Sequence, residues 1–278
     1  SFGIWIEPEM VNVDSELYRE HPDWTMDIPD CDHSEGRNQR LLDLANPDVV
    51  SYIAEKIINV LSSAEISYVK WDMNRIISDY YSRYLPRERQ LETGLRYVEG
   101  FYELCKKITG AFPDILFEGC ASGGNRFDLG MLCFFPQIWA SDNTDPMERL
   151  HTQKGLSYFY PQSTMGCHVS ASPHMQTMRH SEMETRGNVA FFGDLGYELD
   201  LDHASYENKK KIREQIKFYR KNQKVFQFGT FYRYDTDADH EQWQVLKDDV
   251  SMVGVFRRLG SSAPGFEKIC IYALDPTT

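Results

Sequence analysis

The stretch "NPDVVSYIAEKIINVLSSAEISYVKWDMN", residues 46–74, places a helix pattern directly before a strand pattern and decides the fold class. Asn46 is suited to cap the helix, and Pro47 suits its first position. Apolar residues then recur at helical spacing: Val50, Ile53, Ile57 and Leu61. A short apolar strand follows and ends in polar residues. Repeats of such a unit predict a parallel sheet with helices outside it.

The same alternation runs through most of the chain. Strands are predicted at residues 3–8, 67–73, 114–120, 137–142, 164–170 and 195–201. Helices are predicted at residues 46–65, 86–109, 124–135, 146–160, 181–193 and 204–226. Six strand–helix units in a row fit either a doubly wound sheet or a (β/α)8 barrel.

Polar residues at the strand ends favour the barrel. They lie at or just past the carboxyl ends of successive strands, where barrel active sites are built; they are Glu7, Glu9, Asp72, Glu118, Cys120, Asp142 and His168. No G-x-G-x-x-G follows a strand, and "ASGGN" at 121–125 lacks the lysine and serine of a phosphate loop. We therefore predict an α/β fold, a (β/α)8 TIM barrel that is incomplete because two units are expected before residue 1.

The pattern of apolar and polar residues changes after about Gly229. Four segments, residues 230–235, 241–249, 250–258 and 267–275, alternate apolar and polar residues with turn-like breaks between them. We predict a catalytic domain over residues 1–228 and the beginning of a carboxyl-terminal β-sandwich domain over residues 229–278.

Bulk properties exclude several classes of protein. The chain has 278 residues, a net charge of −12 and a pI of about 5.1, with no basic stripe for nucleic acid and no apolar run for a membrane. The six cysteines form no C-x-x-C pair, which predicts reduced, mostly buried thiols and a cytoplasmic protein. Since the chain opens in a strand without a start methionine or leader, it is expected to be an excerpt of a longer one.

The strand over residues 67–73 ends in a row of polar side chains. Side chains two apart on a strand point the same way, so Lys70, Asp72 and Asn74 form one row. The opposite row consists of Val69, Trp71 and Met73. A neighbouring cation lowers the pKa of a carboxyl group, which suits an attacking nucleophile. A structural ion pair at a strand end explains the same spacing equally well.

A second carboxylate, Asp142, ends the strand over residues 137–142, close to Trp139. Nearby Asp145 precedes Pro146 and is interpreted as a helix cap. Two carboxylates on separate strands with aromatic rings beside them suit cleavage of a glycosidic bond. The sequence thus predicts Asp72 and Asp142 as a catalytic pair.

Other candidates give weaker signals. Three histidines, His168, His174 and His180, lack metal-ligand spacing, so hydrogen-bonded structural roles are expected and no metal is predicted. Cys120 has no partner histidine for a catalytic thiol but can line a pocket. Gly123 and Gly124 let the backbone turn tightly. Arg37 in a polar loop and Trp5 in the first strand are each open to a binding or a structural role.

Long motifs in the chain resemble glycoside hydrolase family 36, the large microbial α-galactosidases. The motifs include "GIWIEPEMVNVDSELYREHPDW", "SEGRNQRLLDLANPDV", "YVKWDMNR", "FEGCASGGNRFDLGM", "QIWASDNTD" and "FFGDLGYELDL". They run in unbroken order from residue 3 to about residue 230. The family's upstream strand with paired aspartates and its amino-terminal β-domain are absent, and "GCASGG" differs from the more usual "SCSGGG".

The resemblance implies a retaining α-galactosidase that hydrolyses terminal α-galactosyl residues of melibiose, raffinose and stachyose, without a cofactor. It assigns the nucleophile to Asp72 and the acid/base to Asp142. Galactose contacts carry over to Trp5, Arg37, Lys70, Asn74, Cys120, Gly123 and Trp139. A homo-oligomer, often a tetramer, is also implied for the full-length protein.

Other functions stay open on the residues alone. They are α-N-acetylgalactosaminidase or α-galactosyl transglycosylase activity at the same site, Schiff-base chemistry at Lys70, and sugar binding without catalysis.

Overall fold

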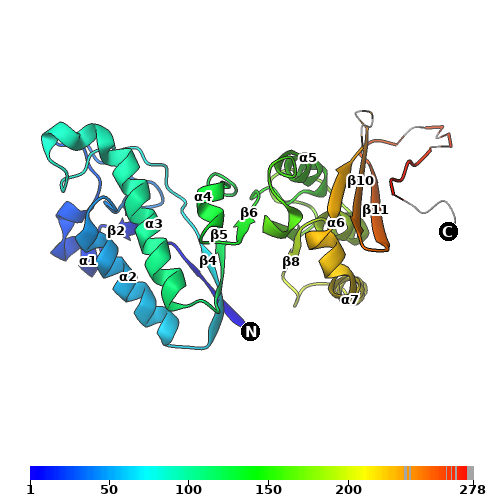
Figure 1. The fold of residues 1–278 in the computed structure, drawn as a ribbon, viewed down its shortest axis with the longest axis horizontal. Helices are drawn as coiled ribbons and strands as arrows, with labels where there is room; N and C mark the ends of the chain where they lie inside the picture. The colour runs from blue at the N-terminus through cyan, green and yellow to red at the C-terminus, as the bar shows by residue number, and fades with distance from the viewer. Residues whose placement is uncertain (235–236, 238, 261, 264, 267, 274–278) are drawn as a thin grey trace. The chain divides into compact units, whose positions relative to one another are not determined.

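Two compact units, Ser1–Trp139 and Ala140–Thr278, make up the computed structural model of the chain (Figure 1). The structure describes residues 1–273 except 235, 236, 238, 261, 264 and 267.

Four parallel strands form the sheet of the first unit. In spatial order they are β1 (Phe2–Ile6), β4 (Ile66–Trp71), β5 (Leu116–Gly119) and β6 (Gln137–Trp139). The register places Trp5 beside Lys70, and Lys70 beside Glu118. Because parallel neighbours in register point to the same face, these three side chains form one row across the sheet.

Helices follow the strands of this unit in the predicted order, although the one predicted over residues 124–135 is only four residues long. They are α2 (Pro47–Ser62), the 3-10 helix η2 (Arg87–Glu92), α3 (Thr93–Ala111) and α4 (Leu129–Leu132). Asn46 caps α2 by accepting from the backbone N–H of Asp48, and the predicted apolar stripe of the helix is buried. Helices α2 and α3 lie side by side (Figure 1). The helix predicted over residues 86–109 continues to Ala111, so Gly110 lies inside it.

The segment between β1 and α2 contains structure that the periodicity did not predict. Two short strands, β2 (Met10–Asn12) and β3 (Gln39–Leu41), pair antiparallel. Helix α1 (Glu16–Glu20) and the 3-10 helix η1 (Pro22–Trp24) lie between them in the chain. Strands of three residues are too short to give an alternation signal.

The second unit continues the strand–helix alternation with two parallel strands, β7 (Met165–Ser170) and β8 (Asp194–Glu198). Its helices are α5 (Pro146–Leu156), η3 (Gln162–Thr164), α6 (Met183–Ala190) and α7 (Tyr206–Phe228). An antiparallel sheet follows, in the order β11 (Val250–Arg257), β10 (His240–Lys247) and β9 (Thr230–Arg233). Helix α7 packs against β10 (Figure 1).

An aromatic core joins the helices of this unit to its antiparallel sheet. Trp243 of β10 is fully buried, and Phe192, Phe231 and Phe256 pack edge-on against it. The predicted fourth strand is not found: described residues 268–273 form no strand, and residues 267, 274 and 275 lie outside the described part.

Six parallel strands that alternate with helices, followed by an antiparallel sheet, confirm the prediction of an incomplete (β/α)8 barrel. The boundary near residue 229 between two domains stays a prediction. Within the described residues, no helix is long and apolar enough to cross a membrane.

Candidate active site

Asp72 follows the last residue of β4 and lies at the centre of a hydrogen-bond cluster. Trp5 Nε1 donates to its Oδ2 at 3.1 Å, and Asn74 Nδ2 donates to the same oxygen at 2.8 Å. The backbone N–H of Met73 donates to Oδ1 at 2.8 Å. Asp72 is 7% exposed, so its carboxylate is largely shielded from solvent.

The donors around Asp72 keep it ionised. Burial by itself raises the pKa of its carboxyl group, but hydrogen bonds outweigh burial, and the pKa lies below its ordinary value. The donors are Asn74, Cys120, Trp5 and the Met73 backbone. The sequence predicted this direction but attributed it to Lys70, which is not among the main causes.

Lys70 instead faces the next strand. Its Nζ lies 3.4 Å from Oε1 of the fully buried Glu118 and 4.4 Å from the centre of the Trp139 ring. Tyr68 and Gln137 also donate to Glu118. Glu118 therefore has polar partners on its own strand's neighbours and belongs to the row of side chains that crosses the sheet. Trp139 is 2% exposed. Lys70 is therefore held between a carboxylate of β5 and a ring of β6.

The prediction that alternate side chains of this strand face opposite sides is confirmed by the second row. Val69, Trp71 and Met73 are buried, as predicted for the row that packs behind the site. The Trp71 ring contacts Phe101 of α3 edge-on at 6.0 Å between ring centres.

Arg37 and Glu7 join the cluster through Asn74. Arg37 and Asn38 form a two-residue turn between the bridged residues Gly36 and Gln39, and both have positive φ, 56° and 60°. This turn places Arg37 so that its Nη1 lies 3.0 Å from Oε1 of Glu7. Asn74 Nδ2 donates to that same oxygen.

Cys120 and Gly123 border the cluster from the turn after β5. Burial raises the pKa of the Cys120 thiol, and the charge of Asp72 adds to the effect, so the thiol stays protonated and donates to the carboxylate. Ser122 (φ 47°) and Gly123 (φ 86°) adopt left-handed conformations in this turn, as expected for the glycine. Ser122 Oγ donates to Oδ1 of Asn74 at 3.1 Å.

Asp142 belongs to the second unit, in the loop before α5, and is exposed. The residues that follow Asp142 in the chain hold this loop in place. Asp145 is fully buried, caps α5 through the backbone N–H of Met147, and accepts from Thr177 and Arg179. The capping role predicted for Asp145 is therefore confirmed.

Two of the three candidate histidines, His168 and His174, make contacts within this unit, whereas His180 is exposed. His174 is 4% exposed, and its Nε2 lies 3.0 Å from Oγ1 of Thr144, the residue before Asp145. His168 Nδ1 lies 3.9 Å from Glu198. Among the described residues, no group of three or more His, Cys, Asp or Glu side chains is placed to hold a metal ion.

Glu9 has a role that sequence reasoning missed. Predicted at the mouth of the barrel, it is fully buried and bonded to Arg126 at 2.9 and 3.0 Å. Trp71 Nε1 and the Tyr97 hydroxyl also donate to it, at 3.0 and 2.7 Å. Arg126 lies 117 positions further along the chain, so spacing gave no signal for the pair.

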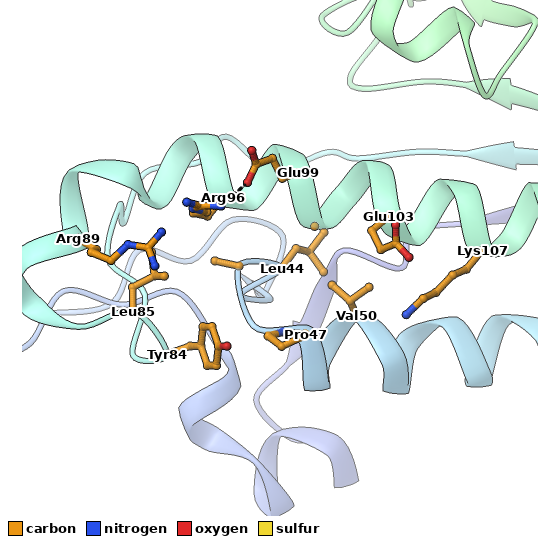
Figure 2. Close-up of a pocket in the computed structure, with 12 residues that line it drawn as sticks. Leu44, Pro47, Val50, Tyr84, Leu85, Arg89, Arg96, Glu99, Glu103 and Lys107 are labelled. Atoms are coloured by element: carbon orange, nitrogen blue, oxygen red, sulfur yellow. Dashed lines mark hydrogen bonds and ion pairs between the residues drawn. The ribbon is translucent and has the colours of Figure 1, made fainter.

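A hollow of about 370 Å³ lies between α2 and α3, away from these residues (Figure 2). Leu44, Val50 and Leu85 form part of its apolar wall, and the pair Arg96–Glu99 lies at its rim. No predicted site residue lines it, so it is not a candidate active site.

The described cysteines are free thiols, as predicted. Only half are buried, Cys105, Cys120 and Cys167, whereas Cys31, Cys133 and Cys270 are exposed. The expectation of mostly buried thiols is therefore wrong, because three of the cysteines fall in exposed segments.

The first unit thus brings together Trp5, Arg37, Asn74, Cys120 and Asp72, and places Lys70 and Trp139 next along the sheet. A carboxylate kept ionised at the carboxyl end of a barrel strand suits the chemistry by which glycoside hydrolases cleave a glycosidic bond. Residues 1–229 match the family model described as melibiase. The chain belongs to the melibiase family.

Curated relatives are α-galactosidases. AgaA of Geobacillus stearothermophilus is 47% identical over 278 residues, which cover 99% of this chain and 38% of AgaA. Mel36A of Lactobacillus acidophilus is 45% identical, with the same coverage of both chains. The chain therefore spans about two fifths of the length of these relatives.

A solved structure agrees closely with the fold. The crystal structure of AgaA, a family 36 α-galactosidase, matches with a TM-score of 0.96 and 46% identity over 99% of this chain and 39% of AgaA. Variants of AgaA have been solved in complex with raffinose and with stachyose.

Proposed function

We propose that the protein carrying this chain is a retaining α-galactosidase that hydrolyses terminal α-D-galactosyl residues of galacto-oligosaccharides such as melibiose, raffinose and stachyose. The observation that carries the proposal is the Asp72 carboxylate, which four donors hold ionised at the end of β4. An ionised carboxylate in this position is suited to attack an anomeric carbon.

The reaction proceeds in two displacements. Asp72 attacks the anomeric carbon and forms a galactosyl ester, while Asp142 donates its proton to the glycosidic oxygen as the bond to the leaving group breaks. Asp142 then takes a proton from water, whose oxygen attacks the same carbon and releases galactose and the Asp72 carboxylate. Two inversions retain the anomeric configuration.

Polar and aromatic groups around Asp72 bind the sugar. Arg37 and Lys70 supply N–H donors for galactose hydroxyl groups, and Trp5 supplies ring surface. The buried Trp139 ring lies against the Lys70 ammonium group and supports it from behind. Trp5 is half exposed, in keeping with a ring that contacts a ligand. Asn74, Cys120 and Gly123 complete this side of the pocket. The names of the relatives, and the raffinose and stachyose complexes of AgaA variants, support this substrate class.

The test uses the longest natural chain that contains these residues. Asp72→Ala is expected to abolish turnover of an aryl α-galactoside, and azide is expected to restore it with formation of the β-galactosyl azide. Asp48→Ala, at an exposed position of α2, is the matched control and keeps full activity.

Two results would contradict the proposal. One is a wild-type protein that releases β-galactose first, as seen by proton NMR, because this indicates inversion. The other is preferential turnover of an aryl α-N-acetylgalactosaminide.

We further propose that the full-length protein is a homo-oligomer, as the family resemblance implies, and that it is cytoplasmic. Six free thiols are in keeping with a reducing compartment. Light scattering on the full-length protein as it elutes from a size-exclusion column measures its mass. A monomeric mass at micromolar concentration contradicts the proposed homo-oligomer.

A further inference from the structure

Glu7 connects two residues that the proposed reaction uses. Its side chain is 8% exposed, and Oε1 accepts from both Arg37 Nη1, at 3.0 Å, and Asn74 Nδ2. Gln39 Nε2 lies 3.5 Å from the other oxygen. Three donors, two from the turn at residues 36–39 and one from Asn74, therefore converge on one largely buried carboxylate.

The Asn74 amide has no freedom to turn while Glu7 is present. Its Nδ2 carries two hydrogens, of which one goes to Asp72 and the other to Glu7. Its Oδ1 accepts from Ser122 Oγ at 3.1 Å. A flipped amide would turn its oxygen toward two carboxylates, so the pair of acids selects the orientation that donates to Asp72.

Arg37 depends on the same carboxylate. The guanidinium is 54% exposed and extends from a tight turn, so little packing holds it in place. Glu7 supplies an opposite charge that holds the Nη1 end of the guanidinium group. Its other N–H groups are then available to a ligand. Arg37 in turn compensates the charge of Glu7 close to Asp72.

We propose that Glu7 is a positioning residue for the reaction: it fixes the Asn74 amide so that it donates to the nucleophile Asp72, and it fixes Arg37 for the sugar hydroxyl groups. This inference rests on the proposed function. Glu7 itself does not react. Its effect reaches the substrate through Arg37 and the nucleophile through Asn74.

The two substitutions Glu7→Gln and Glu7→Ala separate these effects. Glutamine keeps an oxygen for the Asn74 amide but loses the charge that holds Arg37, so KM rises while kcat stays within a few-fold. Alanine loses both contacts, so kcat falls as well and kcat/KM decreases about 10- to 100-fold, the usual effect of a small misplacement near reacting groups. Glu99→Ala, which breaks an exposed pair with Arg96, is the matched control and leaves both constants unchanged.

Double substitutions test whether Glu7 acts through its two partners. The loss caused by Glu7→Ala is expected to shrink when Asn74→Ala or Arg37→Ala is already present, since one of the two contacts is then already gone. An equal loss in all backgrounds, or a Glu7→Ala protein within two-fold of wild type, overturns the inference. If Glu7→Ala does not fold, Glu7→Gln still tests the inference. It is expected to raise KM while kcat stays within a few-fold, and an unchanged KM would overturn the inference.

The outcome also separates this inference from the proposed function. Active wild type with unaffected Glu7 variants overturns only the positioning role. A wild-type protein without turnover of an aryl α-galactoside overturns both.

Discussion

Asn74 Nδ2 donates to Oδ2 of Asp72 at 2.8 Å, and the Trp5 indole reaches the same oxygen at 3.1 Å. Two donors on one carboxylate oxygen stabilise its charged form, which is the form that attacks. These bonds outweigh the burial that raises the pKa of the carboxyl group.

Trp5→Phe keeps an aromatic ring but removes one donor from Asp72. Because the pKa of Asp72 in the wild type lies below its ordinary value, activity should persist until the pH falls through that lowered pKa. Loss of the donor raises the pKa, so the acidic limb of kcat/KM moves to higher pH. Trp24→Phe is the control, and an acidic limb at the wild-type pH in Trp5→Phe would contradict the role of the indole.

Arg126→Met tests the buried pair with Glu9. The substitution leaves a fully buried carboxylate with only the Trp71 and Tyr97 donors, and breaking such a pair costs about 3–5 kcal/mol of unfolding free energy. Arg96→Met, which breaks exposed pairs on α3, should cost under about 1 kcal/mol. Urea unfolding followed by tryptophan fluorescence compares the two variants, and equal losses would argue against a structural role for the pair.

Gly100→Ala tests the close approach of α3 to the chain before α2. A Cβ at Gly100 would lie 1.7 Å from the backbone oxygen of Leu44, so the helix has to shift. We expect a loss of roughly 1–3 kcal/mol despite the better helix propensity of alanine. Gly110→Ala on the same helix meets no atom within 4 Å and should be neutral or stabilising. Thermal unfolding measures both, and a Gly100→Ala variant as stable as Gly110→Ala would contradict the contact.

Local patterns predicted much of the fold because their causes are local. The cap at Asn46 and the apolar stripe of α2 depend on residues within a few turns of one another. The antiparallel pair of β2 and β3 was missed because each strand has only three residues, and the pairing joins segments far apart in the chain.

The site was predicted in part. The spacing of "YVKWDMNR" correctly separated the polar row from the buried row of Val69, Trp71 and Met73. Periodicity assigns a face to each side chain but does not choose its partner. Lys70 therefore looked like the cation of Asp72, whereas strand register places it beside Glu118.

The sequence by itself determined the order of strands and helices, the strand ends that carry polar residues, and through its long motifs the family. Only the tertiary structure decided that Asp72 is kept ionised by hydrogen bonds, that Glu9 pairs with Arg126, and that Glu7 holds Asn74 and Arg37. The physical reason is distance along the chain. Side chains on neighbouring strands and their loops meet across 30 to 117 positions, and only the register of the folded sheet brings them within hydrogen-bond reach.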